Sequence, residues 1–437
     1  MDFKNRTQIA NIFTSDPETV TIAGWVQQVR NLGGLKFIQL QDRSGLVQIV
    51  LPKKKVSPEI FTIDYQEGDI LLVQGKVVTN NSAPKGKEIL PSTIDIVNKR
   101  QQEYPIAIDD KINTNIDKRL DYRYLDLRNR SVAQIFEIES AVAYAFQEFF
   151  HKNNFLQFFS SKIVGSATES GANVFEIGYF GRKAYLAQSP QFYKQMMLVS
   201  GFEKVFEIGP VFRAEKHHTS RHLCEYTSID FEIAYISDQK DVMKVLQEAI
   251  MYTLDKVRKE KADSLEELGV IIEKQPKQWP ILSHQEIHEI LENEGKELGE
   301  YEDLDAEAEK ILGEYVKEKY NSDFVFADEY PWEVRPFYTM KKEDNDNLTK
   351  SFDLLYKGQE LTTGGQREHR ADILEKQAEE KGFKKEEVAS YIQFFRNGTP
   401  PHGGSGTGIE RFVQKLLNLP NIREARLLPR DPTRVHP

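Results

Sequence analysis

The first hundred residues alternate apolar and polar positions in short runs. The runs TVTIAGWVQQVR, LKFIQLQDRSGLVQIVL, DILLVQGKVV and KEILPSTIDIV fall within residues 18–103 and are separated by Gly, Asn and Ser. Alternation with a period of two predicts strands, and the polar breaks predict turns. Four or five short strands in about 85 residues predict a small closed barrel, of which the oligonucleotide-binding (OB) type is the best match. A barrel with no nucleic-acid role is the alternative.

The pattern changes twice after the barrel. Residues 104–130 are rich in Pro, Asp and Arg, with weak periodicity, and predict a hinge. From residue 131 the run SVAQIFEIESAVAYAFQEFFHKNN has the helical period. The strand-like runs KAYLAQ, KVFEIGPVFRAE and EYTSIDFEIAY follow, so residues 131–437 predict an α+β domain on an antiparallel sheet. Charged, helix-rich residues at about 272–340 predict an inserted helical subdomain. The barrel domain would span residues 1–103.

Composition indicates an ordinary globular chain. The 437 residues are 39% hydrophobic and 29% charged, which is typical of soluble domains. We find no run of about 18 apolar residues and no N-terminal signal pattern, so we expect no membrane span. The single cysteine, Cys224, excludes an internal disulfide and favours a cytoplasmic location.

The net charge of −10 argues against a general nucleic-acid binder. The charge is unevenly distributed, because residues 1–103 carry a net charge of +2 and the remainder −12, much of it in residues 256–350. A local basic surface is enough for specific phosphate contacts. The composition therefore leaves a specific nucleic-acid partner open.

The segment PVFRAEKHHTSRHLCEYTSIDFE, residues 210–232, brackets a polar loop with two arginines, Arg213 and Arg221. Guanidinium groups bind phosphate oxygens in a bidentate manner, so this pattern favours a polyphosphate ligand. A hairpin with surface ion pairs is the alternative. The Gly-rich run PPHGGSGTGIERFVQKLL, residues 400–417, would let the backbone approach a ligand closely. It lacks the Gly-Lys-Ser/Thr of a Walker loop.

Two further stretches carry unusual polar residues. In SFDLLYKGQELTTGGQREHR, the carboxylates of Asp353 and Glu360 lie seven residues apart and could converge on a hard cation with Thr363. Taken singly, they could be solvated turn residues. In QSPQFYKQ, residues 188–195, Lys194 stands where a core residue is expected. A helix lysine that extends to solvent is the alternative there.

The order of these stretches resembles motifs 2 and 3 of the class II aminoacyl-tRNA synthetases. An N-terminal OB-like barrel is similar to that of the aspartyl, asparaginyl and lysyl subgroup. QSPQFYKQ and GGQREHR resemble the aspartyl-tRNA synthetases of the archaeal and eukaryotic kind. The resemblance covers nearly the whole chain. It implies that ATP and Mg²⁺ activate L-aspartate as an adenylate, from which the acyl group passes to tRNA.

The resemblance also implies roles for individual residues. Lys194 and Arg367 would meet the side-chain carboxylate of aspartate, and two cations in a closed site favour Asp over neutral Asn. Tyr226 would stack on one face of adenine and Arg411 would cover the other. The residues implied for ATP and catalysis are Arg213, Glu215, Arg221, His222, Leu223, Tyr226, Glu360 and Arg411. Those implied for aspartate are Glu169, Ser189, Gln191, Lys194, Asp230, Thr363 and Arg367, and those for the metal are Asp353, Glu360 and Thr363.

The same resemblance assigns anticodon contacts to the barrel. Phe37 and Gln48 match positions that stack on and read anticodon bases, although core packing is the alternative for Phe37. Enzymes of this kind that charge only tRNA(Asp) tend to carry Trp where Gln27 stands and Lys where Pro84 stands. The absence of both implies a non-discriminating enzyme that aspartylates tRNA(Asp) and tRNA(Asn). Such an enzyme implies a partner amidotransferase that converts Asp-tRNA(Asn) to Asn-tRNA(Asn).

One departure concerns assembly, since Ser161 stands where the family carries Pro in the segment that usually forms a dimer interface. We still expect a homodimer. The alternatives in function are a discriminating enzyme specific for tRNA(Asp), an asparaginyl-tRNA synthetase, a free-standing asparagine synthetase, and a catalytically silent RNA-binding paralogue. Lys194 argues against the asparaginyl enzyme, and the attached barrel argues against the free-standing synthetase.

Overall fold

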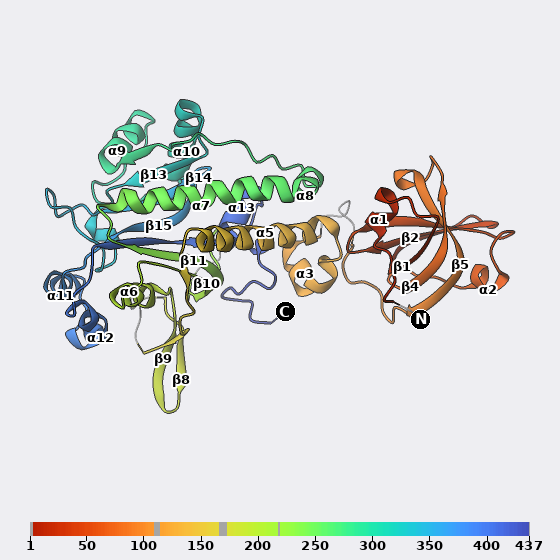
Figure 1. Ribbon diagram of the computed structural model, residues 1–437, viewed down its shortest axis with the longest axis horizontal. Coiled ribbons are helices and arrows are strands. Elements are labelled where there is room, and N and C mark those ends of the chain that lie inside the picture. Colours follow the sequence, from red (N-terminus) through yellow and green to blue (C-terminus); the bar gives the residue numbers. More distant parts are fainter. Residues whose placement is uncertain (1–2, 109–113, 166–172, 217–218, 437) are drawn as a thin grey trace. The chain divides into compact units, whose positions relative to one another are not determined.

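The computed structural model describes residues 3–108, 114–165, 173–216 and 219–436. The chain divides into two compact units, Met1–Arg130 and Ser131–Pro437 (Figure 1). No helix in the described part of the chain is both long and apolar enough to cross a membrane.

The first unit contains a closed five-stranded barrel with the strand order β1-β2-β3-β5-β4. Its inward positions alternate with outward ones, and the inward side chains of Ile22, Ile38, Ile49 and Val73 are completely buried. The predicted closed barrel is therefore confirmed. Its strands are β1 (Thr19–Asn31), β2 (Leu35–Asp42), β3 (Gly45–Pro52), β4 (Ile70–Thr79) and β5 (Lys87–Asn98), and its short helices are α1 (Ile9–Thr14), α2 (Pro58–Thr62) and η1 (Pro84–Gly86).

The stretch predicted as a hinge, 104–130, contains two short helices, α3 (Ile116–Asp121) and α4 (Arg123–Asp126). They are stabilised by ion pairs: the Asp126 carboxylate is buried and lies 2.9 Å from Arg119 and 2.5 Å from Arg123. Polar pairing of this kind leaves no apolar stripe in the sequence, which is why periodicity does not reveal these helices.

The second unit is built on an eight-stranded sheet with the order β12-β13-β14-β15-β16-β11-β10-β6. Its centre is antiparallel, but β6 pairs with β10 and β12 pairs with β13 in parallel, so the sheet is mixed rather than purely antiparallel. The strands are β6 (Leu156–Gln157), β10 (Lys204–Phe212), β11 (Glu225–Ala234), β12 (Ile281–Ser283), β13 (Phe324–Asp328), β14 (Ser351–Tyr356), β15 (Glu360–Arg367) and β16 (His402–Gly408).

Two long amphipathic helices, α5 (Arg130–Lys152) and α7 (Gln239–Glu260), run side by side across one face of the sheet (Figure 1). The rings of Phe149 on α5 and Tyr252 on α7 lie 5.8 Å apart. The apolar sides of both helices share one core with the sheet. The long helix expected from residue 131 is confirmed, because its periodicity reflects burial of one side.

Residues 272–340 do not form a purely helical insertion. They contain α9 (His284–Asn293) and α10 (Ala306–Tyr320), but β12 and β13 within the same stretch belong to the main sheet. The remaining elements are the small sheet of β7 (Ile163–Val164), β8 (Glu176–Tyr179) and β9 (Arg182–Leu186), with α6 (Gln191–Val199), α8 (Ala262–Glu267), η2 (Trp332–Val334), α11 (Ala371–Glu380), α12 (Lys385–Phe395), α13 (Ile409–Leu416) and η3 (Ile422–Ala425).

Candidate active site

A cavity of about 330 Å³ lies over the antiparallel centre of the main sheet in the second unit. Strands β11, β15 and β16 supply polar side chains and glycines to its floor, and α6 and the segment after β10 supply its walls. Most of the predicted site residues meet here. Those that line the cavity are Ser189, Gln191, Lys194, Arg213, Glu215, Arg221, His222, Leu223, Tyr226, Asp230, Glu360, Thr363, Arg367 and Arg411.

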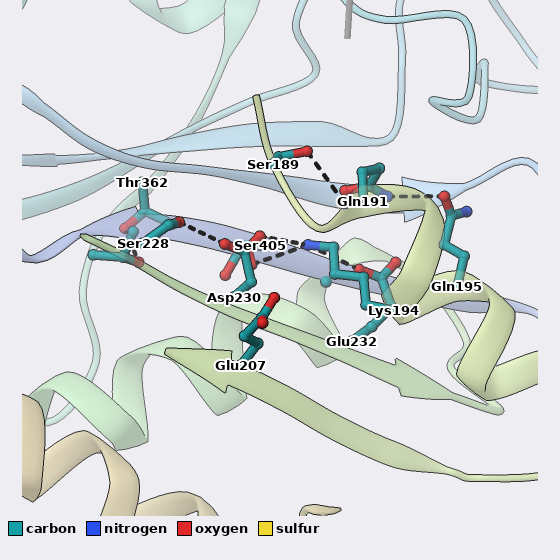
Figure 2. A network of polar contacts seen from close by, with 12 residues as sticks. Ser189, Gln191, Lys194, Gln195, Glu207, Ser228, Asp230, Glu232, Thr362 and Ser405 are labelled. Carbon is teal, nitrogen blue, oxygen red and sulfur yellow. Dashed lines mark hydrogen bonds and ion pairs between the residues drawn. The ribbon is translucent and has the colours of Figure 1, made fainter. Parts of the chain in front are cut away.

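Lys194 is buried on α6, and only 1% of its side chain is exposed. Its ammonium nitrogen lies 3.1 Å from Asp230 Oδ1, 3.2 Å from Glu232 Oε2 and 3.2 Å from the backbone oxygen of Ser405. Figure 2 shows the side chain reaching from α6 to this group. Lys194 is therefore a buried cation of the cavity wall rather than a lysine that extends to solvent.

Arg367 completes a cluster of two cations and two carboxylates. Its Nε donates to Glu232 Oε1 at 2.9 Å, and a terminal nitrogen donates to the backbone oxygen of Gly404 at 2.9 Å. Burial disfavours the charged form of Glu232, but Arg367 and Lys194 outweigh this effect and lower its pKa. Lys194 and Arg367 thus lie together on this side of the cavity, each paired with a buried carboxylate.

A chain of hydrogen bonds holds the α6 end of the cavity in place. Gln191 Nε2 donates to Gln195 Oε1 at 2.9 Å, and the Tyr391 hydroxyl donates to the same oxygen at 2.7 Å. Gln195 Nε2 lies 2.8 Å from His402 Nε2, while His402 Nδ1 lies 2.9 Å from the backbone oxygen of Pro400. His402 must then carry its proton on Nδ1. Ser189 Oγ accepts from the backbone N–H of Gln191 at 3.2 Å.

The other end of the cavity carries arginines around an aromatic ring. The β10–β11 pair places Arg213 one residue beyond β10 and Tyr226 within β11. The Arg213 guanidinium lies 5.9 Å from the centre of the Tyr226 ring. An aromatic face beside a guanidinium group suits a purine with its phosphates. Glu215 and His222 line the same region, and burial, followed by the nearby Arg411, lowers the pKa of His222.

Glu360 and Thr363 sit together at the start of β15. The Thr363 hydroxyl donates to Glu360 Oε1 at 3.2 Å, and Arg411 lies 3.3 Å from the same oxygen. Burial disfavours ionised Glu360, but Arg411 and Arg335 outweigh it and lower the pKa. The Glu360 carboxylate therefore keeps its charge beside a hydroxyl, which is a suitable donor set for a hard cation.

Asp353 is placed differently from the prediction. It faces Thr363 across β14 and β15, but its side chain is buried below the cavity lining and pairs with Arg335 at 2.7 Å. Arg335 in turn lies 3.8 Å from the centre of the Tyr330 ring. Burial raises the pKa of Asp353 to about 6 although Arg335 opposes the shift. Among the described residues no group of three or more His, Cys, Asp or Glu side chains could hold a metal by itself.

The structure adds three charged residues that sequence reasoning missed: Glu232, Arg335 and Glu309. Glu232 could have been found, because it follows Asp230 by two positions and shares its strand face. Arg335 and Glu309 come from outside the recognised motifs, and no local pattern marks them. Glu309 pairs with Arg221 at 2.7 Å, and burial, aided by Glu360, raises the pKa of Glu309 to about 7. Glu169 lies outside the described residues.

The predicted anticodon residues lie on the barrel surface. Phe37 and Gln48 alternate with the core positions of β2 and β3, and Phe37 is not part of the barrel core. Gln48 Nε2 donates to Glu88 Oε2 at 2.8 Å. Gln27 lies at an irregularity in the pairing of β1 with β2, and Pro84 is exposed in the turn between β4 and β5. Outward placement leaves Phe37 available for stacking on a base.

Two family models match the two units. "tRNA synthetases class II (D, K and N)" matches residues 115–432, and "OB-fold nucleic acid binding domain" matches residues 20–97. The chain is 45% identical to "Aspartate--tRNA(Asp) ligase" of Pyrococcus abyssi over 96% of both chains. It is 44% identical to "Aspartate--tRNA(Asp/Asn) ligase" of Aeropyrum pernix, over 96% of this chain and 95% of that protein.

A solved structure with the same fold is asparaginyl-tRNA synthetase from Pyrococcus horikoshii complexed with asparaginyl-adenylate. It matches with a TM-score of 0.92 and 28% identity over 100% of both chains. The fold is thus shared with enzymes named for either amino acid, whereas the two ligases above, named for aspartate, are more similar in sequence. The OB-fold barrel, the cavity and the full-length matches lead to one conclusion: this chain belongs to the class II tRNA synthetases of the D, K and N group.

Proposed function

We propose that the chain ligates L-aspartate to tRNA through an aspartyl-adenylate. The observation that carries this proposal is the buried pair of cations, Lys194 and Arg367, at one end of the cavity. Asp230 would accept the α-ammonium group of the substrate. Once Asp230 is engaged there, the charge of Lys194 faces the side-chain carboxylate. Neutral asparagine would form no ion pair with that charge, which favours aspartate.

ATP would occupy the end of the cavity that holds the arginines. Arg213 would contact the α-phosphate, Arg221 and His222 the outer phosphates, and Tyr226 and Arg411 the two faces of adenine. The α-carboxylate of the bound aspartate would attack the α-phosphorus of ATP, and pyrophosphate would leave. The residues of the chain hold the reacting groups in line and offset the phosphate charge.

Glu360 and Thr363 would hold Mg²⁺, which offsets negative charge on the ATP phosphates when it is bound. One carboxylate and one hydroxyl fit a cation that keeps several waters and shares phosphate oxygens. Asp353 would not contact the ion directly, because its carboxylate lies below the cavity lining and is paired with Arg335. Glu169 would close over the amino acid, and Ser189 and Gln191 would line its site.

In the barrel, Phe37 and Gln48 would contact anticodon bases. We propose a non-discriminating enzyme that aspartylates both tRNA(Asp) and tRNA(Asn), supported by Gln27 and Pro84 and by the name of the Aeropyrum relative. Its product on tRNA(Asn) would need a tRNA-dependent amidotransferase. The barrel would span residues 1–103, the hinge 104–130 and the catalytic domain 131–437. The enzyme would act in the cytoplasm.

A homodimer is part of the proposal. The side chains of Leu156, Phe159 and Ile163, which flank Ser161, are 42%, 81% and 49% exposed. Several exposed large apolar side chains in one short segment are typical of an interaction site. Light scattering at micromolar concentration would give about twice the mass of one chain if the dimer forms.

The function is tested by two assays on the pure protein. Aspartate-dependent ATP–pyrophosphate exchange would establish adenylate formation, and asparagine in its place should give no exchange. Aspartylation of tRNA(Asp) and tRNA(Asn) transcripts, side by side, would then separate the two tRNA specificities. Charging of tRNA(Asp) alone would support a discriminating enzyme. Absence of both activities would favour a silent RNA-binding paralogue.

A further inference from the structure

Helix α10 contacts the proposed nucleotide site through one buried carboxylate. Glu309, in the first turns of α10, is only 7% exposed although its side chain is polar. Its Oε2 accepts a hydrogen bond from an Arg221 terminal nitrogen at 2.7 Å. The backbone of Glu309 also reaches the turn before β15, because a Cβ atom on Gly358 would lie 3.2 Å from the backbone oxygen of Glu309. A single residue of α10 therefore contacts both the loop that carries Arg221 and the turn that leads into Glu360.

A second, independent contact fixes α10 against the same strand. One turn after Glu309, a Cβ atom on Gly313 would lie 2.5 Å from the Cα atom of Gly358. Gly358 has φ +66° and lies in the turn between β14 and β15, two residues before Glu360. Only glycine at both positions allows this backbone contact without displacement. The helix is thus seated directly on the turn that leads into Glu360.

We propose that Glu309 is a positioning residue for the nucleotide, acting through Arg221 and Glu360. A guanidinium group is planar, so fixing one of its nitrogens orients the plane in which the others donate. The contact of α10 with Gly358 likewise fixes the turn from which Glu360 follows. Preorganised charges of this kind contribute to phosphate binding and to stabilisation of the transition state. This inference rests on the proposed roles of Arg221 and Glu360.

The contact has a functional consequence for the stretch 272–340. The helix comes from a part of the chain that carries none of the recognised motifs, yet its Glu309 side chain contacts Arg221, which lines the cavity. Glu309 would not touch the reacting atoms. Its effect should appear in the affinity for ATP and Mg²⁺ and leave the affinity for aspartate unchanged.

The test is ATP–pyrophosphate exchange by Glu309→Ala and Glu309→Gln, with the KM for ATP and for aspartate measured separately. Loss of a charge-assisted hydrogen bond predicts a KM for ATP raised about tenfold or more in Glu309→Ala. The KM for aspartate should change less than about twofold, because Lys194 and Arg367 are untouched. Glu309→Gln keeps an acceptor oxygen and should lie between the wild type and Glu309→Ala.

The matched control is Glu314→Ala on the same helix, whose side chain is 70% exposed and 3.8 Å from Lys310. It should leave both KM values unchanged. Gly313→Ala should raise the KM for ATP as Glu309→Ala does, because its Cβ would displace α10 from the turn without changing any charge. If Gly313→Ala does not fold, the KM of Glu309→Gln for ATP still tests the inference.

An active wild type whose KM for ATP is unchanged in Glu309→Ala would overturn the inference while leaving the proposed function intact. If that variant also loses thermal stability, Glu309 is a structural tie only. Absence of aspartate-dependent exchange in the wild type would instead count against the proposed function.

Discussion

The barrel of the first unit and the central sheet of the second both contain alternating strands, but these strands bury different kinds of side chain. In the barrel, the buried side of β2 carries aliphatic residues such as Ile38 and Leu40. In the sheet, β11 is buried on both sides: Ile229 and Phe231 pack in the apolar core, whereas Asp230 and Glu232 are buried on the other side with Lys194. The same alternation thus marks a surface strand in one unit and a fully buried strand in the other.

The difference shows that different interactions stabilise the buried side chains of the two units. Apolar area removed from water stabilises the barrel core. Buried charges on the cavity side of β11 cost free energy unless each is paired. We therefore expect substitutions in the sheet to act through unpaired charge, and those in the barrel through lost packing. Four experiments on the two units test this contrast.

The largest effect is expected for Lys194→Met. It would remove the ion-pair partner of Asp230 and leave Glu232 with Arg367 alone. Loss of one partner of a buried ion pair typically costs about 3–5 kcal/mol, so we expect kcat/KM for aspartate to fall a hundredfold to several thousandfold. ATP–pyrophosphate exchange measures the loss. The exposed Lys240→Met should behave as the wild type. Wild-type exchange in Lys194→Met would show that the charge on this side of the sheet is dispensable.

In the barrel, neighbouring residues on β2 should separate packing from recognition. Ile38→Ala removes a fully buried side chain and should lower the free energy of unfolding by about 2–5 kcal/mol. Phe37→Ala should leave that free energy nearly unchanged and weaken tRNA binding by about 1–3 kcal/mol through lost stacking. Urea unfolding and tRNA binding measure the two. Equal destabilisation by both variants would contradict an outward Phe37.

The pH dependence of stability should report on burial of His402. Burial lowers its pKa to about 4 in the folded protein, so the folded state keeps it neutral. The unfolded state binds a proton below about pH 6.5, and stability is lost as pH falls from there toward 4, by up to about 3 kcal/mol. Urea unfolding at several pH values should show a shallower loss in His402→Gln. An identical slope in both proteins would show that His402 does not contribute.

The smallest effect is expected for tRNA choice. The double change Gln27→Trp and Pro84→Lys should lower the ratio of kcat/KM for tRNA(Asn) to that for tRNA(Asp) by about tenfold, the low end of discrimination at one base. Aspartylation of both transcripts measures the ratio. Lys54→Ala, at an exposed barrel position, serves as the control. An unchanged ratio would place the discriminating contacts elsewhere.

The elements with strong periodicity were predicted well because one side of each packs in a core. The five barrel strands and α5 belong to this group. Elements stabilised by polar pairing were missed, as in α3 and α4, where Arg119 and Arg123 pair with Asp126. The edge strand β12 and its neighbour β13 were also missed, because whether short runs join a sheet depends on distant partners.

The sequence by itself determined the two-part architecture, the family and most residues of the cavity, since each rests on local pattern or on motifs that stay contiguous. Only the tertiary structure decided how the charges combine. It pairs Asp353 with Arg335 behind the cavity, ties Lys194 and Arg367 to Glu232, and brings Glu309 to Arg221 from 88 residues away. Electrostatic pairing depends on distances between groups far apart in the chain, and no linear pattern encodes those distances.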